Sequence, residues 1–130
     1  MKKNTKSSFL KSLSNRKVYI NLGLYDFRCG IDSLAATSSA TCPKAFDDGA
    51  LFVYCSKSRK QIRMVFWEGC GVWMISRRLA RGILKWPNKN SDRTHILACY
   101  DDLMALLQDP VSENELRRRK VANKLSKAGR

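Results

Sequence analysis

Hydrophobic residues alternate with other residues along several short stretches of the chain, which is the period of β-strands. The stretches are 17–22, 51–55, 61–67, 72–79 and 83–86. Each is bounded by glycine, proline or polar residues that favour turns, and 68–71 (EGCG) forms a tight connection between two of them. We therefore expect strands at these positions, with an antiparallel meander from 51 to 86.

Two other stretches carry apolar residues at helical spacing. In the first, four residues share one helix face: Phe27, Ile31, Leu34 and Ala35. Asp26 precedes this helix as its expected N-cap, and a loop at 42–49 closes it. In the second, the face is formed by Tyr100, Leu103, Met104 and Leu107. The short apolar run at 95–98 before it is either a strand or the lead-in to this helix.

Arginine and tryptophan lie at alternating positions in two neighbouring strands. In the strand at 61–67, Arg63 and Trp67 share one side, and the opposite side is apolar and is expected to face the core. In the next strand, Trp73 and Arg77 share a side. If the two arginine-bearing sides align, they form a basic strip; the alternative is the ordinary solvated face of an antiparallel sheet.

These elements predict one α+β domain, with an antiparallel sheet of about four or five strands and two packed helices. The domain is expected at 16–110. Residues 1–15 are rich in Lys and Ser and predict a basic disordered tail, with a transit peptide as the weaker alternative. Residues 111–130 form a second basic tail, in which Ser112 and Glu115 make a capping box for a terminal helix.

The net charge of +14 favours an anionic partner, such as nucleic acid, an anionic membrane or an acidic protein. The stretch between residues 57 and 93 contains ten Lys or Arg and two acidic residues. We single out eight of them as candidate nucleic-acid contacts: Lys57, Arg59, Lys60, Arg63, Arg77, Arg78, Arg81 and Lys85. Trp67, Trp73 and Trp86 would add aromatic surface, although tryptophans most often pack in the core.

The five cysteines include no C-x-x-C pair, and His95 is the sole histidine. The odd number of cysteines favours reduced thiols in the cytosol, and the lack of paired ligands argues against structural zinc. Nothing in the sequence singles out one thiol as a catalytic partner of His95. There is also no Gly-rich phosphate loop and no apolar run long enough for a membrane helix. We therefore expect no metal, cofactor or membrane association.

The acidic residues do not predict an active site. The candidates for a magnesium-dependent nuclease would be Asp26, Asp32, Glu68, Asp101 and Asp102. Each has a simpler role as a helix cap, on a polar helix face, in a hairpin turn, or in the first turn of a helix, where the macrodipole favours acids. We therefore expect a protein without enzymatic activity.

Several ordered blocks of sequence resemble one known family. They are YDFRCGIDSLA at 25–35, LFVY at 51–54, IRMVFWEGCG at 62–71, RRLARGILKWP at 77–87 and LMALLQD at 103–109. In this order they resemble the small accessory proteins, called TnpB, of the insertion-sequence-66 family of bacterial transposable elements. The chain departs from the family pattern at Tyr25 (Thr in the pattern), Cys29 (Lys) and Ala80 (an acid).

The resemblance covers residues 17–110 and implies a non-catalytic partner of a separate, larger transposase encoded by the same mobile element. We therefore expect an accessory protein for DNA transposition in the bacterial cytoplasm, associated with the nucleoid. Its expected partners are the cognate transposase and DNA, whose backbone the basic residues would contact with weak sequence specificity. The alternative is an adaptor that docks on the transposase through its tryptophans without touching DNA.

Overall fold

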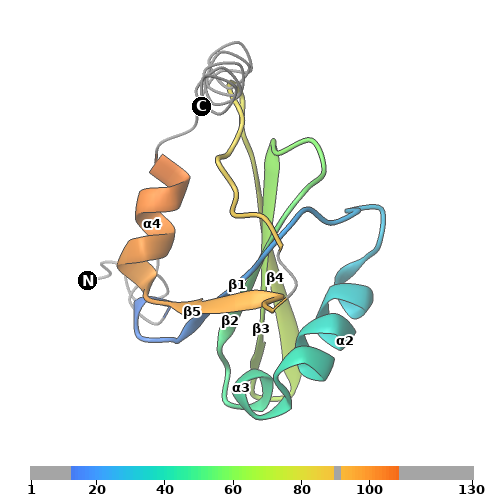
Figure 1. Ribbon diagram of the computed structural model, residues 1–130. Coiled ribbons are helices and arrows are strands. Elements are labelled where there is room, and N and C mark those ends of the chain that lie inside the picture. Colours follow the sequence, from blue (N-terminus) through green and yellow to red (C-terminus); the bar gives the residue numbers. More distant parts are fainter. Residues whose placement is uncertain (1–12, 90–91, 109–130) are drawn as a thin grey trace, which may run out of the picture.

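Five strands form one sheet in the order β4-β3-β2-β1-β5 (Figure 1). They are β1 (Val18–Asn21), β2 (Leu51–Cys55), β3 (Gln61–Glu68), β4 (Gly71–Arg78) and β5 (His95–Ala98). The computed structural model describes residues 13–89 and 92–108. β1 is parallel to β2, and all other neighbouring strands are antiparallel. The expected α+β class and mainly antiparallel sheet are therefore confirmed, and the run at 95–98 is a strand.

Three helices lie wholly within the described residues: α2 (Ile31–Thr41), α3 (Pro43–Asp47) and α4 (Tyr100–Gln108). α2 and α3 connect β1 to β2 and thus form the crossover that a parallel strand pair requires. α3 lies where the sequence predicted only a loop. Pro43 occupies its first turn, where the missing N–H of proline leaves no hydrogen bond unmade.

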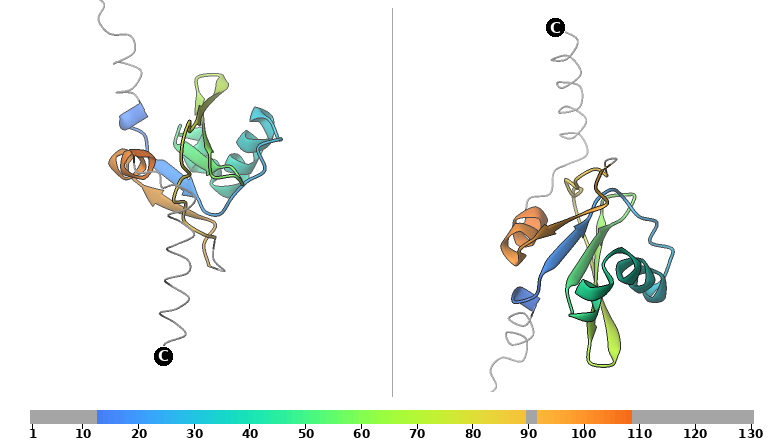
Figure 2. Two further views of the ribbon diagram at one scale, coloured as in Figure 1. Left: turned by 90° about the horizontal axis from the view of Figure 1, so that it is seen from above. Right: turned by 60° about the horizontal axis from the view of Figure 1, so that its bottom comes forward.

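A core lies on each face of the sheet, with α4 on one side and α2 and α3 on the other (Figure 2). One core combines alternate strand residues with α4 and the segment after β4: Val18, Ile20, Val53, Ile62, Phe66, Leu84, Trp86, Leu103 and Leu107. The other combines the opposite side of the strands with α2 and α3: Leu34, Phe46, Phe52, Tyr54 and Val65. All five residues of β2 are buried because this central strand contributes to both cores.

The predicted strand at 83–86 is wrong, although its residues are buried. Leu84 donates its N–H to the carbonyl oxygen of Arg59 at 2.8 Å, and Trp86 Nε1 donates to the carbonyl oxygen of Asn21 at 2.9 Å. These hydrogen bonds go to the β2–β3 connection and to the last residue of β1, and they do not form a strand ladder. It crosses the sheet between the two edge strands β4 and β5 and covers part of the α4 side.

The predicted N-cap of the first helix is also wrong. α2 begins at Ile31, with Gly30 as its N-cap. Asp26 instead accepts a hydrogen bond at 2.9 Å from the backbone N–H of Arg28, which places its carboxylate in a local turn. The expected tails at 1–15 and 111–130 fall largely outside the described residues, although Leu13 is buried in the core beside α4.

Candidate nucleic-acid interface

The connection between β3 and β4 decides which arginines share a face of the sheet. Glu68 pairs with Gly71, leaving a turn of two residues in which Gly69 has a φ of 64°. A positive φ at the first turn position is typical of tight hairpins and favours glycine. In this register Arg63 pairs with Ser76, and Arg77 pairs with Ile62.

Arg63 and Arg77 therefore lie on opposite faces, because directly paired residues point to the same side of a sheet. The predicted basic strip is wrong for this reason. The same register places Trp67 opposite Val72 and Trp73 opposite Phe66, so these two tryptophans also lie on opposite faces. Of these two tryptophans, only Trp73, which is 48% exposed, presents a large apolar surface to solvent.

A different arrangement brings most of the candidate residues together at one end of the sheet. Lys60 accepts a hydrogen bond at its carbonyl oxygen from Leu79 N–H at 2.7 Å, and Arg59 accepts one from Leu84. The β2–β3 connection, the end of β4 and the segment after β4 therefore meet, at the end opposite α3 (Figure 1). We call this surface the basic end; its residues are Lys57, Arg59, Lys60, Arg77, Arg78, Arg81 and Lys85.

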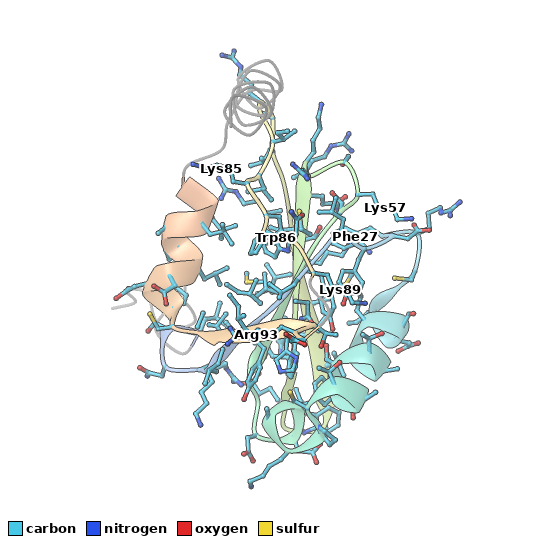
Figure 3. All side chains as sticks on the ribbon, viewed as in Figure 1. Phe27, Lys57, Lys85, Trp86, Lys89 and Arg93 are labelled. Carbon is cyan, nitrogen blue, oxygen red and sulfur yellow. The ribbon has the colours of Figure 1, made fainter. Side chains whose placement is uncertain are left out.

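The side chains of the basic end face solvent. All are exposed except Arg59, which is half-buried. Lys57 and Lys85, which come from different segments, both lie in the half of the molecule opposite α3 (Figure 3). Exposed Lys and Arg gathered from several segments can contact successive phosphates of a nucleic-acid backbone.

Serine hydroxyls hold the loop that carries three of these cations. Ser56 Oγ accepts a hydrogen bond from Gln61 N–H at 3.1 Å, and Ser58 Oγ accepts one from Lys60 N–H at 3.3 Å. Arg59 has a φ of 62°, in the left-handed region that non-glycine residues rarely adopt. The loop therefore holds its backbone in a defined and locally strained shape.

Arg63 differs from the other candidates because its guanidinium is engaged within the fold. Its Nη1 donates to the carbonyl oxygens of Phe27 and Cys29 at 3.0 and 3.1 Å. Its Nε is buried without a hydrogen-bond partner. These contacts give Arg63 a structural role, whether or not it also approaches a ligand.

One acidic residue borders the basic end. Asp26 receives hydrogen bonds from Arg28, which hold the pKa of its carboxyl at about 2, with a smaller contribution from the charge of Lys57. The Asp26 Oδ2 to Arg28 Nη2 distance is 2.6 Å. This carboxylate is thus paired with an adjacent arginine. Asp32 is exposed in the first turn of α2, Asp101 and Asp102 lie in the first turn of α4, and Glu68 ends β3 beside the hairpin turn.

One pairing of functional groups could not be read from the sequence. His95 Nε2 lies 3.4 Å from Cys42 Sγ, although the two residues are 53 positions apart. Only the packing of β5 beside the end of α2 reveals which of the five thiols is near the histidine. Within 13–89 and 92–108, no group of three or more His, Cys, Asp or Glu is placed to hold a metal ion, and no helix is long and apolar enough to span a membrane.

Fold and surface together define a small α+β protein with a cationic end. The sequence profile described as "IS66 Orf2 like protein" matches residues 16–114. The chain belongs to this family, as its ordered sequence blocks indicated, and it is thus an accessory protein of a bacterial insertion sequence.

One curated protein is also similar to this chain. The "Uncharacterized protein y4hO" of Sinorhizobium fredii is 34% identical over 79 residues, which cover 61% of this chain and 69% of that protein. No solved structure matches the chain.

Proposed function

We propose that this accessory protein binds the DNA backbone through its basic end during transposition. The observation that carries the proposal is the convergence of seven Lys and Arg side chains from three chain segments, fixed by backbone hydrogen bonds at Arg59 and Lys60. The segments are a loop, a strand end and an extended stretch rather than a helix. Sequence specificity is expected to be weak, because phosphate contacts position a protein on DNA without reading bases.

The cognate transposase is the second expected partner, since family membership associates the chain with an insertion sequence. In this role the basic end would hold DNA beside the transposase. The expected place of action is the bacterial cytoplasm, at the nucleoid.

Salt titration of DNA binding tests the proposal. Each contacted phosphate adds about −0.9 to the slope of log affinity against log salt for duplex DNA. Arg78→Ala should weaken binding and reduce the magnitude of that slope by about one contact. The matched control is Lys44→Ala, which removes one exposed charge from α3 at the other end of the sheet. A slope near zero, or equal weakening by both variants, would contradict binding by the basic end.

A specific surface favours an adaptor as the second candidate function. Trp73 is 48% exposed on the edge strand β4, and its ring stacks on Phe66 with centroids 6.4 Å apart. Its Nε1 donates to Glu68 Oε1 at 2.8 Å. An exposed, held tryptophan is typical of the anchor residues at protein interfaces. Capture of the transposase after nuclease treatment, lost in Trp73→Ala but kept in Arg78→Ala, would favour the adaptor over DNA binding.

The absence of catalysis is part of the same proposal. Incubation of the protein with DNA and magnesium should give no cleavage. Cleavage that Asp26→Asn or Glu68→Gln abolishes would instead support a metal-dependent nuclease.

A further inference from the structure

A cysteine and a histidine meet on the α2 and α3 side of the sheet. Cys42 lies between α2 and α3, and His95 is the first residue of β5. The imidazole Nε2 is 3.4 Å from the thiol, while Nδ1 lies 3.2 Å from Thr94 Oγ1. In the tautomer protonated at Nδ1, the imidazole donates to Thr94 and Nε2 accepts the thiol proton.

The histidine is held in place by its aromatic neighbour. The His95 and Tyr19 rings are tilted at 49°, with centroids 5.6 Å apart. Tyr19 in turn stacks on Phe52 in the core, with centroids 5.1 Å apart. The imidazole therefore rests against the half-buried Tyr19, which is stacked on the buried Phe52, and is oriented toward Cys42.

Cys42 lines a cleft of about 510 Å³ between the start of β1 and α3. Tyr19, Cys42 and Pro43 line it together with the cations Arg16, Lys17 and Lys44 and the carboxylate of Asp48. Lys44 pairs with Asp48 at 3.7 Å, and Arg16 pairs with Glu68 at 3.7 Å. For Lys17, no ion pair is found within the described part of the chain. The cleft thus offers net positive charge beside a thiol.

The other four thiols lack this combination of histidine and cleft. Cys55 is fully buried, and burial raises the pKa of its thiol to about 12. Cys29 is half-buried and donates its thiol hydrogen to the carbonyl oxygen of Asp26 at 3.1 Å. Cys70 and Cys99 are exposed. Accessibility alone would therefore make Cys70 and Cys99 the most reactive.

We propose that Cys42 is a modification site that exchanges with small anionic disulfides. The thiol proton passes to His95 Nε2, and the Cys42 thiolate attacks one sulfur of the disulfide. A Cys42–sulfur bond forms, the original sulfur–sulfur bond breaks, and the departing thiolate takes the proton from His95. The products are a mixed disulfide at Cys42 and one free small thiol, and attack of one such thiol on the mixed disulfide reverses the step. The cationic cleft selects a disulfide that carries carboxylates.

Reaction of the full-length protein with oxidised glutathione at neutral pH, followed by peptide mass spectrometry, tests the order of reactivity. Cys42 should be modified before the more exposed Cys70 and Cys99. Equal or slower modification of Cys42 would overturn the proposal.

Replacement of the histidine tests its part in the step. His95→Gln should slow modification of Cys42 by about tenfold, less than for a hydroxyl nucleophile because a thiol is already partly ionised at neutral pH. The rates at Cys70 and Cys99 in the same sample serve as internal references, and circular dichroism checks the fold. An unchanged Cys42 rate in a folded variant would refute a role for His95.

The charge of the cleft is tested with a second disulfide. Cystamine is a cationic disulfide. The ratio of the rate with oxidised glutathione to the rate with cystamine should therefore be higher at Cys42 than at Cys70. Lys17→Glu should reduce or invert that preference. If the preference is absent, or is unchanged in Lys17→Glu, the cleft does not select the reagent. None of these readouts depends on DNA binding, so they stand apart from the test of the basic end.

Discussion

The guanidinium carbon of Arg63 lies 4.6 Å from the centre of the Phe27 ring, so that this cation stacks on an aromatic residue of the loop before α2. The same guanidinium donates to the backbone of that loop. Through these contacts, the Arg63 side chain links the loop before α2 to the middle of β3. The basic residues between 57 and 85 therefore divide into Arg63, whose guanidinium contacts the fold, and the cations of the basic end, of which all but Arg59 are exposed.

Arg63→Ala should lower the free energy of unfolding by about 2 kcal/mol, because a cation–π contact and charged hydrogen bonds are lost. Arg63→Lys should also destabilise, since lysine keeps the charge but lacks the planar fork. Urea unfolding measures both. Arg77→Ala, at an exposed position, should leave stability nearly unchanged; a similar loss there would argue against the division.

Arg59 allows backbone strain and charge to be separated. Arg59→Ala removes the cation but keeps a side chain at a φ of 62°, whereas Arg59→Gly removes both. The glycine variant should be more stable than the alanine variant by about 1 kcal/mol, because glycine adopts the left-handed region without steric cost. Both variants should lose DNA affinity equally. Thermal unfolding and DNA titration provide the two measurements, and different affinities would show that loop shape also matters for binding.

A buried hydroxyl pair links α2 to β2. Ser38 Oγ and Tyr54 Oη are 2.6 Å apart, and Ser38 also donates to the carbonyl oxygen of Leu34 at 2.8 Å. Burial raises the pKa of the Tyr54 phenol, which therefore stays neutral. Ser38→Ala leaves that phenol without its closest partner and should cost about 2 kcal/mol, whereas Tyr54→Phe should cost about 1 kcal/mol.

The double variant should cost less than the sum of the two single changes, because the two hydroxyls share one hydrogen bond. Chemical denaturation of all four proteins measures this coupling. Additive costs would show that the two groups act independently.

Asp26 gives a pH dependence with a defined sign. The pKa of its carboxyl in the folded protein is about 2, below the ordinary 3.8. Because the folded value is the lower one, the pairing with Arg28 stabilises the fold fully above the ordinary pKa and is lost as pH falls through about 2. Carboxyl NMR titration should place Asp26 near 2. The stability difference between the wild type and Asp26→Asn should shrink over the same range, and titration of Asp26 near its ordinary value would contradict the pairing.

The local periodicity was sufficient to predict β2, β3, β4 and the helix at 100–108. Within these strands it also divided the residues of β3 between two sides correctly. It could not give the pairing of β1 with β2, because a parallel strand has the same alternation as an antiparallel one. The segment at 83–86 looks like a strand for a related reason: burial, not pairing, sets its pattern.

The candidate site was predictable in part. Charge along the sequence identified the cations of the basic end, but the strip expected on the face of the sheet required a register that the two-residue turn at 69–70 does not allow. The contacts of Arg63 with Phe27 and of Cys42 with His95 join distant parts of the chain. Such contacts depend on the packing of whole elements and leave no local pattern.

The backbone hydrogen bonds from Leu79 to Lys60 and from Leu84 to Arg59 have a further consequence. They hold like charges near one another, so the folded protein bears a repulsion that the unfolded chain would relieve. Added salt screens this repulsion. It also weakens DNA binding, because the release of counterions from DNA is less favourable at high salt. The same ions are therefore expected to raise the melting temperature of the free protein while dissociating its DNA complex.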